Sequence, residues 1–276
     1  MTEPETRPSA WEPLTPRGVA AFARATSGRL CVVQLLVAFV AAAAVVWFLQ
    51  DGWCPTVRDA IERLPDEGKI HSGKLDWRGE SPQLLAEGTF LAFSVDLEHA
   101  SDRRSPAHVQ VEFGRETFHL QSLLGYSEVR YPAKWIVAFN RKDLKPWWGA
   151  WQPALLAGAA AAVVVGLLLV WYALATIYTV PAWLVAFFAN RDLRLNEAGR
   201  LAGAALMPGA LLMAVGILLY DFGVLDLVGL GFVAGGHFVL GWIYLFVSPL
   251  FLPKNPTAAS TRKNPFGTSG KTRDSR

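Results

Sequence analysis

The chain has 276 residues, of which 52% are hydrophobic and only 18% are charged, with a net charge of +3 at neutral pH. A soluble domain usually carries about 25% charged residues, so the composition argues against a soluble protein. The charge deficit lies in four uncharged runs, each long enough for the ~20-residue helix that crosses a bilayer. The runs are Leu30–Gln50, Pro146–Asn190, Leu201–Tyr220 and Leu227–Pro253.

The first run predicts an uncleaved signal anchor at residues 30–50. Its leader, residues 1–29, is polar and contains prolines, and we expect it to be disordered in the cytoplasm. The run has full span length, and no small-residue cleavage site separates it from polar sequence. Trp47 and Trp53 bracket its far end, where aromatic rings favour the membrane interface.

Residues 51–145 carry a normal soluble mixture of charges and predict a small extracytoplasmic α+β domain. Pro55–Leu64 has the apolar spacing of a short helix, and residues 91–98 alternate as a half-buried strand does. The further candidate strands are 109–113, 118–120, Tyr126–Tyr131 and Lys134–Phe139.

The strands on either side of Gly114–Arg115 predict a hairpin with a two-residue turn. That turn places Val111 opposite Phe118, so the apolar faces of the two strands agree. The same register places His119 opposite Gln110.

The uncharged stretch Pro146–Asn190 is too long for one crossing. Trp151 and Trp171 are 20 residues apart, about 30 Å along a helix, which matches the hydrocarbon thickness. The remainder, Ala173–Ala189, contains Pro181. It is either a kinked extension in the near interface or a fifth span.

Charge favours four spans. With four spans and the N-terminus inside, the cytoplasmic segments hold 13 basic and 6 acidic residues, and the outer segments hold 13 basic and 17 acidic residues. The short basic flanks then all face the cytoplasm, as the positive-inside rule requires. A fifth span would place residues 191–200 and the basic tail outside.

The expected fold class is therefore an α+β membrane protein. A four-helix transmembrane bundle carries a small extracytoplasmic α+β domain between its first two spans, and both termini are cytoplasmic. The protein is expected in the cell membrane, which is the inner membrane if the source is Gram-negative. The expected segments are a disordered N-terminus at 1–29, spans at 30–50, 146–190, 201–220 and 227–249, the outer domain at 51–145, a cytoplasmic loop at 191–200, an outer turn at 221–226 and a disordered basic tail at 250–276.

Two single residues are candidate functional positions. His237 is the only ionisable side chain well inside a predicted span. It is either hydrogen-bonded to a neighbouring helix or part of a proton or metal path, for which the spans supply no second ligand. Cys54 is a lone thiol on the outer side, since Cys31 lies about a membrane thickness away.

Small residues spaced four apart predict close helix contacts, either within one chain or in a homodimer. They are Gly158, Ala162 and Gly166 in the second span and Gly231 and Gly235 in the fourth.

Neither a cofactor nor a metal is expected. The predicted hairpin brings only His108 and His119 near each other, and a zinc site usually needs three or four ligands. Asp221 and Asp226 are interpreted as polar residues that end two helices. The chain contains no recognised catalytic motif, so we expect it not to be an enzyme.

Three short pieces of the chain carry a family resemblance. They are Leu64–Pro65 with Ile70 and Gly73–Leu75, the strand ending at Asp96, and Asn196–Arg200 with Ala205–Pro208. These pieces resemble an uncharacterised family of bacterial membrane proteins, one member of which is linked by name to maltodextrin utilisation. The resemblance implies a small extracytoplasmic domain after the first span and a Yip-type membrane core, which often has five spans. It carries no catalytic residues.

These features favour a non-enzymatic sensor or scaffold whose outer domain binds a ligand or partner. A small transporter or channel component is the alternative, since such proteins line a path with polar or broken helices. The expected partners are the lipid bilayer and either another protein or a second copy of the chain, with no nucleic acid.

The topology can be checked by cysteine labelling at positions 100, 195 and 260, in a chain whose native cysteines are replaced by serine. A membrane-impermeant thiol reagent is expected to label position 100 in intact cells. Positions 195 and 260 are expected to react only after permeabilisation. Labelling of position 195 from outside would overturn the four-span arrangement.

Overall fold

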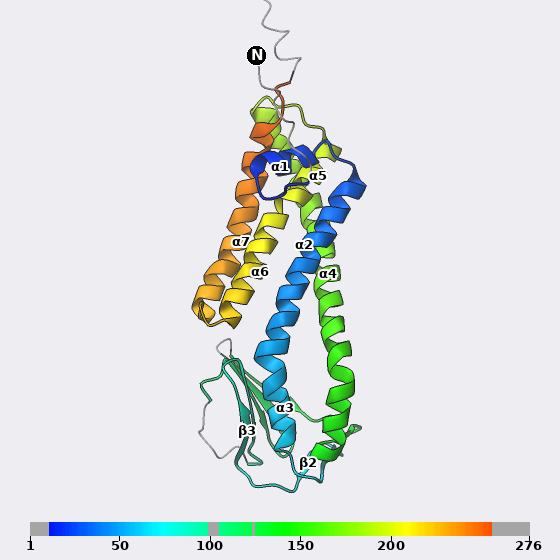
Figure 1. Ribbon diagram of the computed structural model, residues 1–276, viewed down its shortest axis with the longest axis vertical. Helices are drawn as coiled ribbons and strands as arrows, with labels where there is room; N and C mark the ends of the chain where they lie inside the picture. The colour runs from blue at the N-terminus through cyan, green and yellow to red at the C-terminus, as the bar shows by residue number, and fades with distance from the viewer. Residues whose placement is uncertain (1–10, 99–104, 123–124, 256–276) are drawn as a thin grey trace, which may run out of the picture. The chain divides into compact units, whose positions relative to one another are not determined.

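The computed structural model of the protein describes residues 11–98, 105–122 and 125–255. Four of its helices are long and apolar enough to cross a membrane, and a sheet region at residues 68–138 lies between the first and the second (Figure 1). The expected class of four apolar helices with an inserted α+β domain is thereby confirmed. The four candidate spans are Ser27–Glu62, Arg141–Phe188, Leu195–Asp221 and Leu227–Phe251.

Contacts divide the chain into two compact units. The first unit combines the residues up to Val40 with Val165–Met213 and the residues from Gly231 onward. The second unit combines Ala41–Val164 with Ala214–Leu230. The inserted domain therefore belongs to the same unit as the end of the third candidate span.

The first candidate span is built from three consecutive helical elements. They are α2 (Ser27–Phe48), the π-helix η1 (Leu49–Trp53) and α3 (Cys54–Glu62). Pro55 lies in the first turn of α3, where the missing backbone N–H has no helical partner to lose. The short helix predicted at Pro55–Leu64 is confirmed.

Helix α4 (Arg141–Phe188) runs for 48 residues without interruption. At 1.5 Å per residue its length is roughly 70 Å, and the Ala173–Ala189 stretch continues the same helix through Pro181. A fifth crossing would need a reversal of the chain, which a continuous helix does not contain. The late part of α4 packs on α5, where a Cβ on Gly199 would lie 3.2 Å from Thr179 Oγ1.

The third candidate span consists of α5 (Leu195–Ala205) and α6 (Met207–Asp221), with a break at Leu206. The break lies two residues before Pro208, whose ring is tolerated in the first turn of α6. The fourth span consists of α7 (Leu227–Val247) and the 3₁₀ turn η2 (Ser248–Phe251). Asp226 accepts the Gly229 N–H at 2.6 Å through Oδ1, so it caps α7, as the interpretation of a helix-ending residue expected.

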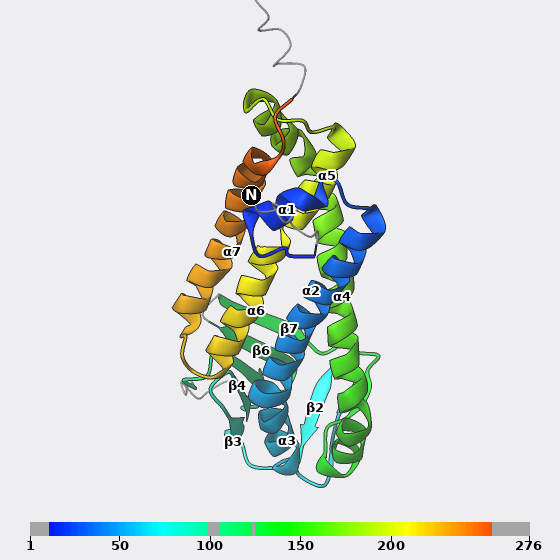
Figure 2. The same cartoon turned by 45° about the horizontal axis from the view of Figure 1, so that its top comes forward.

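The inserted domain contains two sheets. The first has the order β2-β1-β8 and the second has the order β3-β4-β5-β6-β7, in which β4 and β5 are parallel (Figure 2). Ser72 and Gly73 both have positive φ angles and connect β1 to β2 as a tight hairpin. The strands are β1 (Gly68–His71), β2 (Lys74–Trp77), β3 (Gln83–Glu87), β4 (Leu91–Val95), β5 (Val109–Phe113), β6 (Thr117–Ser122), β7 (Gly125–Arg130) and β8 (Ile136–Ala138).

The predicted β5–β6 hairpin exists, but its predicted register is wrong by two residues. Phe113 pairs with Phe118, and His119 pairs with Glu112 instead of Gln110. The turn is longer than two residues because it docks on β2, where the Leu75 N–H donates to the Arg115 carbonyl at 2.7 Å. The shift is even, so apolar residues still face apolar residues.

The core of the inserted domain lies where helix α3 and residues of both sheets meet. Burying these side chains removes apolar surface from water at about 25 cal/mol per Å². The buried members are Ala60, Leu64, Ile70, Leu75, Trp77, Leu85, Ala86, Val95, Tyr131 and Phe139.

The predicted disorder of residues 1–29 is wrong for its second half. Helix α1 (Pro16–Phe22) begins at the N-cap Thr15, and its Val19 and Phe22 side chains are fully buried. The helix packs on α5 and η2, and the Arg200 guanidinium donates two hydrogen bonds to the Ala23 carbonyl, at 2.7 and 3.2 Å. The disorder expected for the tail, residues 250–276, is wrong at its start, because Leu250 and Phe251 belong to η2 and the Pro253 carbonyl accepts the Asp192 N–H at 2.9 Å. Residues 1–10 and 256–276 lie outside the described residues.

In the part of the chain that the structure describes, four of the glycines predicted to mediate helix contacts have open surroundings. A Cβ placed on Gly158, Gly166, Gly231 or Gly235 would meet nothing within 4 Å. Helices α6 and α7 approach instead at Gly209, where a Cβ would lie 2.5 Å from the His237 carbonyl oxygen. The open glycine positions leave the homodimer interpretation of these stripes untested.

Gly209→Ala is expected to destabilise the protein by about 1–3 kcal/mol, because the added methyl group forces α6 away from α7. The matched change Gly235→Ala is expected to be neutral or slightly stabilising, since its surroundings are open and alanine favours a helix. Thermal unfolding of both purified variants in one detergent measures the difference. Equal melting temperatures would contradict the close approach at Gly209.

Candidate functional site

A polar pocket with a volume of about 500 Å³ opens on the five-stranded sheet of the inserted domain. Hydroxyl, amide and imidazole groups line it, together with one exposed aromatic ring, and none of the lining side chains that the structure describes is a carboxylate or an ammonium group. Such a lining suits a ligand that is recognised by hydrogen bonds and ring contact. The lining residues are Ser105, Ala107, His108, Gln110, Gln121, Ser122, Gly125 and Tyr126.

The segment that enters β5 forms one wall of this pocket. The Ser105 N–H donates to Gln110 Oε1 at 2.9 Å, and the Ser105 hydroxyl donates to Glu87 Oε1 at 2.5 Å. The same hydroxyl accepts the Ala107 N–H at 3.1 Å. These bonds hold residues 105–107 against the sheet, so that His108 follows in a defined position.

His108 lies between the pocket and the end of α6. Its Nδ1 forms a short hydrogen bond with the Tyr220 hydroxyl, and the two rings stack with centroids 5.6 Å apart. Phe90 and Phe48 complete an aromatic cluster around Tyr220, with centroids 4.9 and 5.7 Å from its ring. Tyr220 is buried, so its hydroxyl would be costly to bury without the imidazole partner.

Asp221 follows directly and faces the π-helix η1. Both of its carboxylate oxygens are enclosed, and a Cβ on Gly52 would lie 3.4 Å from Oδ1. The Trp47 side chain lies beside the carboxylate, and Asp51 is a second acidic neighbour. Asp221 therefore does more than end a helix, because it contacts the segment where α2 changes to π-helical geometry.

The pocket side of the sheet carries further buried polar groups. His119 Nδ1 lies 3.6 Å from Glu112 Oε1, and the His119 ring meets the Tyr126 ring edge to face at 5.0 Å. Desolvation raises the pKa of the Tyr126 phenol, and the Glu128 and Glu112 carboxylates add to the increase. Tyr126 is therefore a neutral hydrogen-bond donor at physiological pH.

No group of three or more His, Cys, Asp or Glu side chains is arranged to hold a metal ion in the part of the chain that the structure describes. His108 contacts Tyr220 and His119 contacts Glu112, so the two histidines belong to different groups of side chains. His71 is on β1 in the other sheet. His99 lies outside the described residues.

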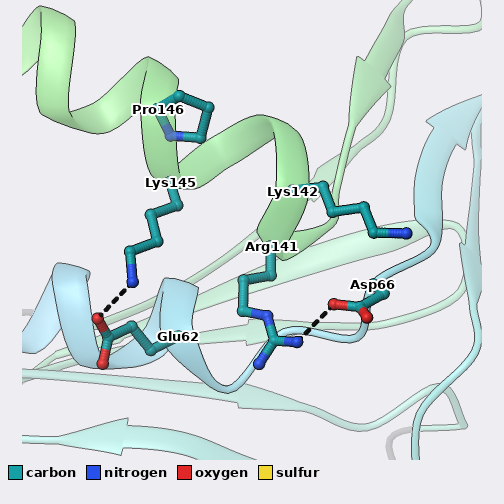
Figure 3. A pocket seen from close by; sticks show the side chains of 6 residues that line it. All are labelled: Glu62, Asp66, Arg141, Lys142, Lys145 and Pro146. Carbon is teal, nitrogen blue, oxygen red and sulfur yellow. Dashed lines mark hydrogen bonds and ion pairs between the residues drawn. The ribbon is translucent and has the colours of Figure 1, made fainter.

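A second pocket, also with a volume of about 500 Å³, has a charged lining at the start of α4 (Figure 3). Lys145 points toward Glu62 at 3.1 Å, and Arg141 points toward Asp66 at 2.6 Å. These ion pairs connect α3 and the segment after it to α4. All four side chains are about half exposed, so each pair contributes at most about 1 kcal/mol.

The structure shows the local surroundings of the residues that the sequence suggested as functional or packing positions. His237 Nδ1 bonds to the Ala234 carbonyl of its own helix, rather than to a neighbouring helix. Cys54 is buried at the start of α3, and neither Cys54 nor the exposed Cys31 forms a disulfide. Ala162, like the four open glycines, lies on an apolar helix surface.

Sequence reasoning missed the pairing of His108 with Tyr220. The two residues are 112 positions apart, and each is unremarkable in its local pattern. The available signal was the position of Tyr220 at the outer end of a predicted span, on the same side as the predicted domain.

Tyr220→Phe removes only the hydroxyl and is expected to cost about 1 kcal/mol of stability. In a chain that already carries His108→Ala, the same change should cost less, with a coupling energy of about 0.5–1.5 kcal/mol. Unfolding of the four proteins of this cycle measures the coupling, and Tyr172→Phe at an exposed position serves as the control. Additive effects would refute the hydrogen bond.

Comparison of the chain with protein-family models, with curated proteins and with solved structures yields no match. The family resemblance of the three short pieces therefore stays a prediction.

Proposed function

We propose that the protein is a membrane-anchored, non-enzymatic sensor or scaffold whose inserted domain binds a polar ligand or partner outside the cytoplasm. One observation carries the proposal: His108 lines the polar pocket and is also hydrogen-bonded to Tyr220 at the end of α6. A group that occupies the pocket thus contacts a residue that holds a candidate membrane span.

The chemistry of the pocket favours an uncharged polar group as the occupant. Gln121 and Ser122 supply an amide and a hydroxyl, and the Tyr126 ring is 58% exposed and available for stacking. Among the lining side chains that the structure describes, a charged group of the occupant would find no carboxylate, ammonium or guanidinium partner.

The pocket is linked to the candidate span because the occupant and Tyr220 compete for the His108 imidazole. An occupant that hydrogen-bonds to His108 Nδ1 draws the ring from Tyr220, whose hydroxyl then lies buried without its hydrogen-bond partner. That cost favours a different position of the end of α6 in the occupied state. A ligand shifts such an equilibrium only by its difference in affinity for the two states, and the His108 bond supplies that difference.

The proposed orientation places the pocket outside and the α1–α5 contact in the cytoplasm. The short segments around that contact are rich in arginine, as the positive-inside rule requires. Arg24 forms a 2.7 Å ion pair with Asp192, and this hydrogen bond raises the pKa of the guanidinium further above its usual range.

A small transporter or channel component is the second candidate, favoured by the helix break at Leu206 before Pro208. The hydrogen bond of His237 to its own helix weighs against a polar path at that residue. A solute flux into proteoliposomes that disappears in His237→Ala would favour this candidate over the sensor.

Photo-crosslinking in intact cells tests the sensor proposal. A photoreactive amino acid at position 126 is expected to give a reproducible adduct of defined mass. The same residue at the exposed position 136, outside the pocket, is the matched control and should not give that adduct. The position-126 adduct is expected to be lost in His108→Phe.

No reproducible adduct at position 126, or the same adducts at positions 126 and 136, would count against the proposal. An adduct that survives His108→Phe unchanged would show that the occupant binds without His108, and it would contradict the proposed link between the pocket and α6.

A further inference from the structure

Among the described residues, no strand pairs with the outer edge of β7 in the five-stranded sheet. Strand β7 ends the strand order, and all six of its residues, Gly125–Arg130, are exposed. At the other end of the sheet, β3 has a register irregularity and packs on α3. An exposed strand of this length presents a row of backbone groups that can pair with another strand.

The register of the β6–β7 hairpin determines which backbone groups point outward. Ser122 pairs with Gly125 across a two-residue connection, which makes this closing pair hydrogen-bonded. Pairs along an antiparallel ladder alternate, so the N–H and C=O groups of Tyr126, Glu128 and Arg130 point away from β6. The Tyr131 N–H donates to the Glu116 carbonyl at 3.0 Å. Tyr131 therefore points its backbone inward, as the alternation expects for the residue after Arg130.

The charges on this edge are self-complementary. Charged side chains usually protect an edge strand, but Glu128 and Arg130 have opposite signs and are two positions apart. When two copies of β7 align antiparallel about Val129, Glu128 of each copy faces Arg130 of the other. Alignment about Glu128 would instead set two carboxylates against each other, which is destabilising.

The alignment about Val129 also satisfies the backbone. Glu128 and the Arg130 opposite it both have outward N–H and C=O groups, so each of the two such pairs forms two hydrogen bonds. The two Val129 residues meet as a non-hydrogen-bonded pair. This agrees with the hairpin register, because the N–H and C=O groups of Val129 point toward β6. Pairing ends where Tyr126 faces Pro132, because proline has no N–H to donate.

We propose that β7 pairs with β7 of a second copy of the chain, antiparallel and centred on Val129, and so joins two inserted domains through one continuous sheet. The contact is isologous, as a two-fold symmetric dimer requires. Anchoring both copies in one membrane raises their effective concentration, so a short ladder suffices. The proposal does not depend on the occupant of the polar pocket.

Disulfide crosslinking of the full chain in membranes tests this register, in a background of Cys31→Ser and Cys54→Ser. Val129→Cys is expected to form a disulfide-linked dimer on mild oxidation, because the two Cα atoms of a non-hydrogen-bonded pair lie about 4.5 Å apart. Ser127→Cys is the matched control on the same strand face. Its two copies would lie roughly 14 Å apart along the ladder and should not crosslink.

Charge reversal supplies a second measurement. Adding Glu128→Arg to Val129→Cys is expected to reduce crosslinking to the level of the Ser127→Cys control, since like charges then face each other. Adding both Glu128→Arg and Arg130→Glu restores the opposite pairs and should restore the crosslink. Recovery in this variant also shows that the loss was not misfolding.

Absence of the Val129→Cys dimer, or equal crosslinking at positions 127 and 129, would overturn the proposal. Failure of the double reversal to restore the dimer would do the same.

Discussion

The continuity of helix α4 is the constraint on which the rest of the structure depends. A helix of 48 residues cannot reverse, so the apolar stretch from Pro146 to Asn190 contains one candidate crossing. With four crossings, the end of α6 lies on the same side of the membrane as the inserted domain. The hydrogen bond between His108 and Tyr220 requires this arrangement, since a fifth crossing would put the two residues on opposite sides.

The inserted domain has two polar regions that differ in chemistry, one at the start of α4 and one on the five-stranded sheet. At the start of α4, opposite charges meet at ion-pair distance, and these half-exposed pairs add at most about 1 kcal/mol each to the contact of α4 with α3 and the segment after it. On the five-stranded sheet, the described lining of the pocket consists of hydroxyl, amide and imidazole groups, and its imidazole is hydrogen-bonded to a buried tyrosine. Burial makes that bond important for stability, because Tyr220 loses its hydrogen-bond partner when His108 turns elsewhere. The pocket residue His108 is therefore joined to the end of α6 by one hydrogen bond and the aromatic rings around it.

The spans and most strands of the second half of the inserted domain could be predicted from the sequence, because a bilayer and a half-buried sheet impose strong patterns. Long uncharged runs marked the spans, and alternation marked β4 and β5. The β5–β6 register could not be predicted, since any even shift keeps apolar residues opposite each other. Only the contact of the turn with β2 selects the observed pairing.

Other elements depend on contacts that no local pattern contains. Helix α1 has seven residues, too few to be stable alone, and its stability comes from burying Val19 and Phe22. Gly209 packs closely while Gly235 does not, although both lie in apolar spans, because spacing alone does not identify which face meets a neighbour. The pairing of His108 with Tyr220 is of the same kind. The short strands β1 and β2 were missed, although Ser72–Gly73 is a turn signal that was available.

The central claim is that the pocket residue His108 lies against the end of α6 in the membrane-embedded chain. It is tested most directly by replacing His108 and Tyr220 with cysteine in a chain free of other cysteines and treating membranes with a short bifunctional thiol reagent. Proteolysis between the two positions then shows whether the fragments stay joined. The account predicts fragments joined within one chain, whereas separate fragments, despite labelling of both thiols by a monofunctional reagent, would contradict it.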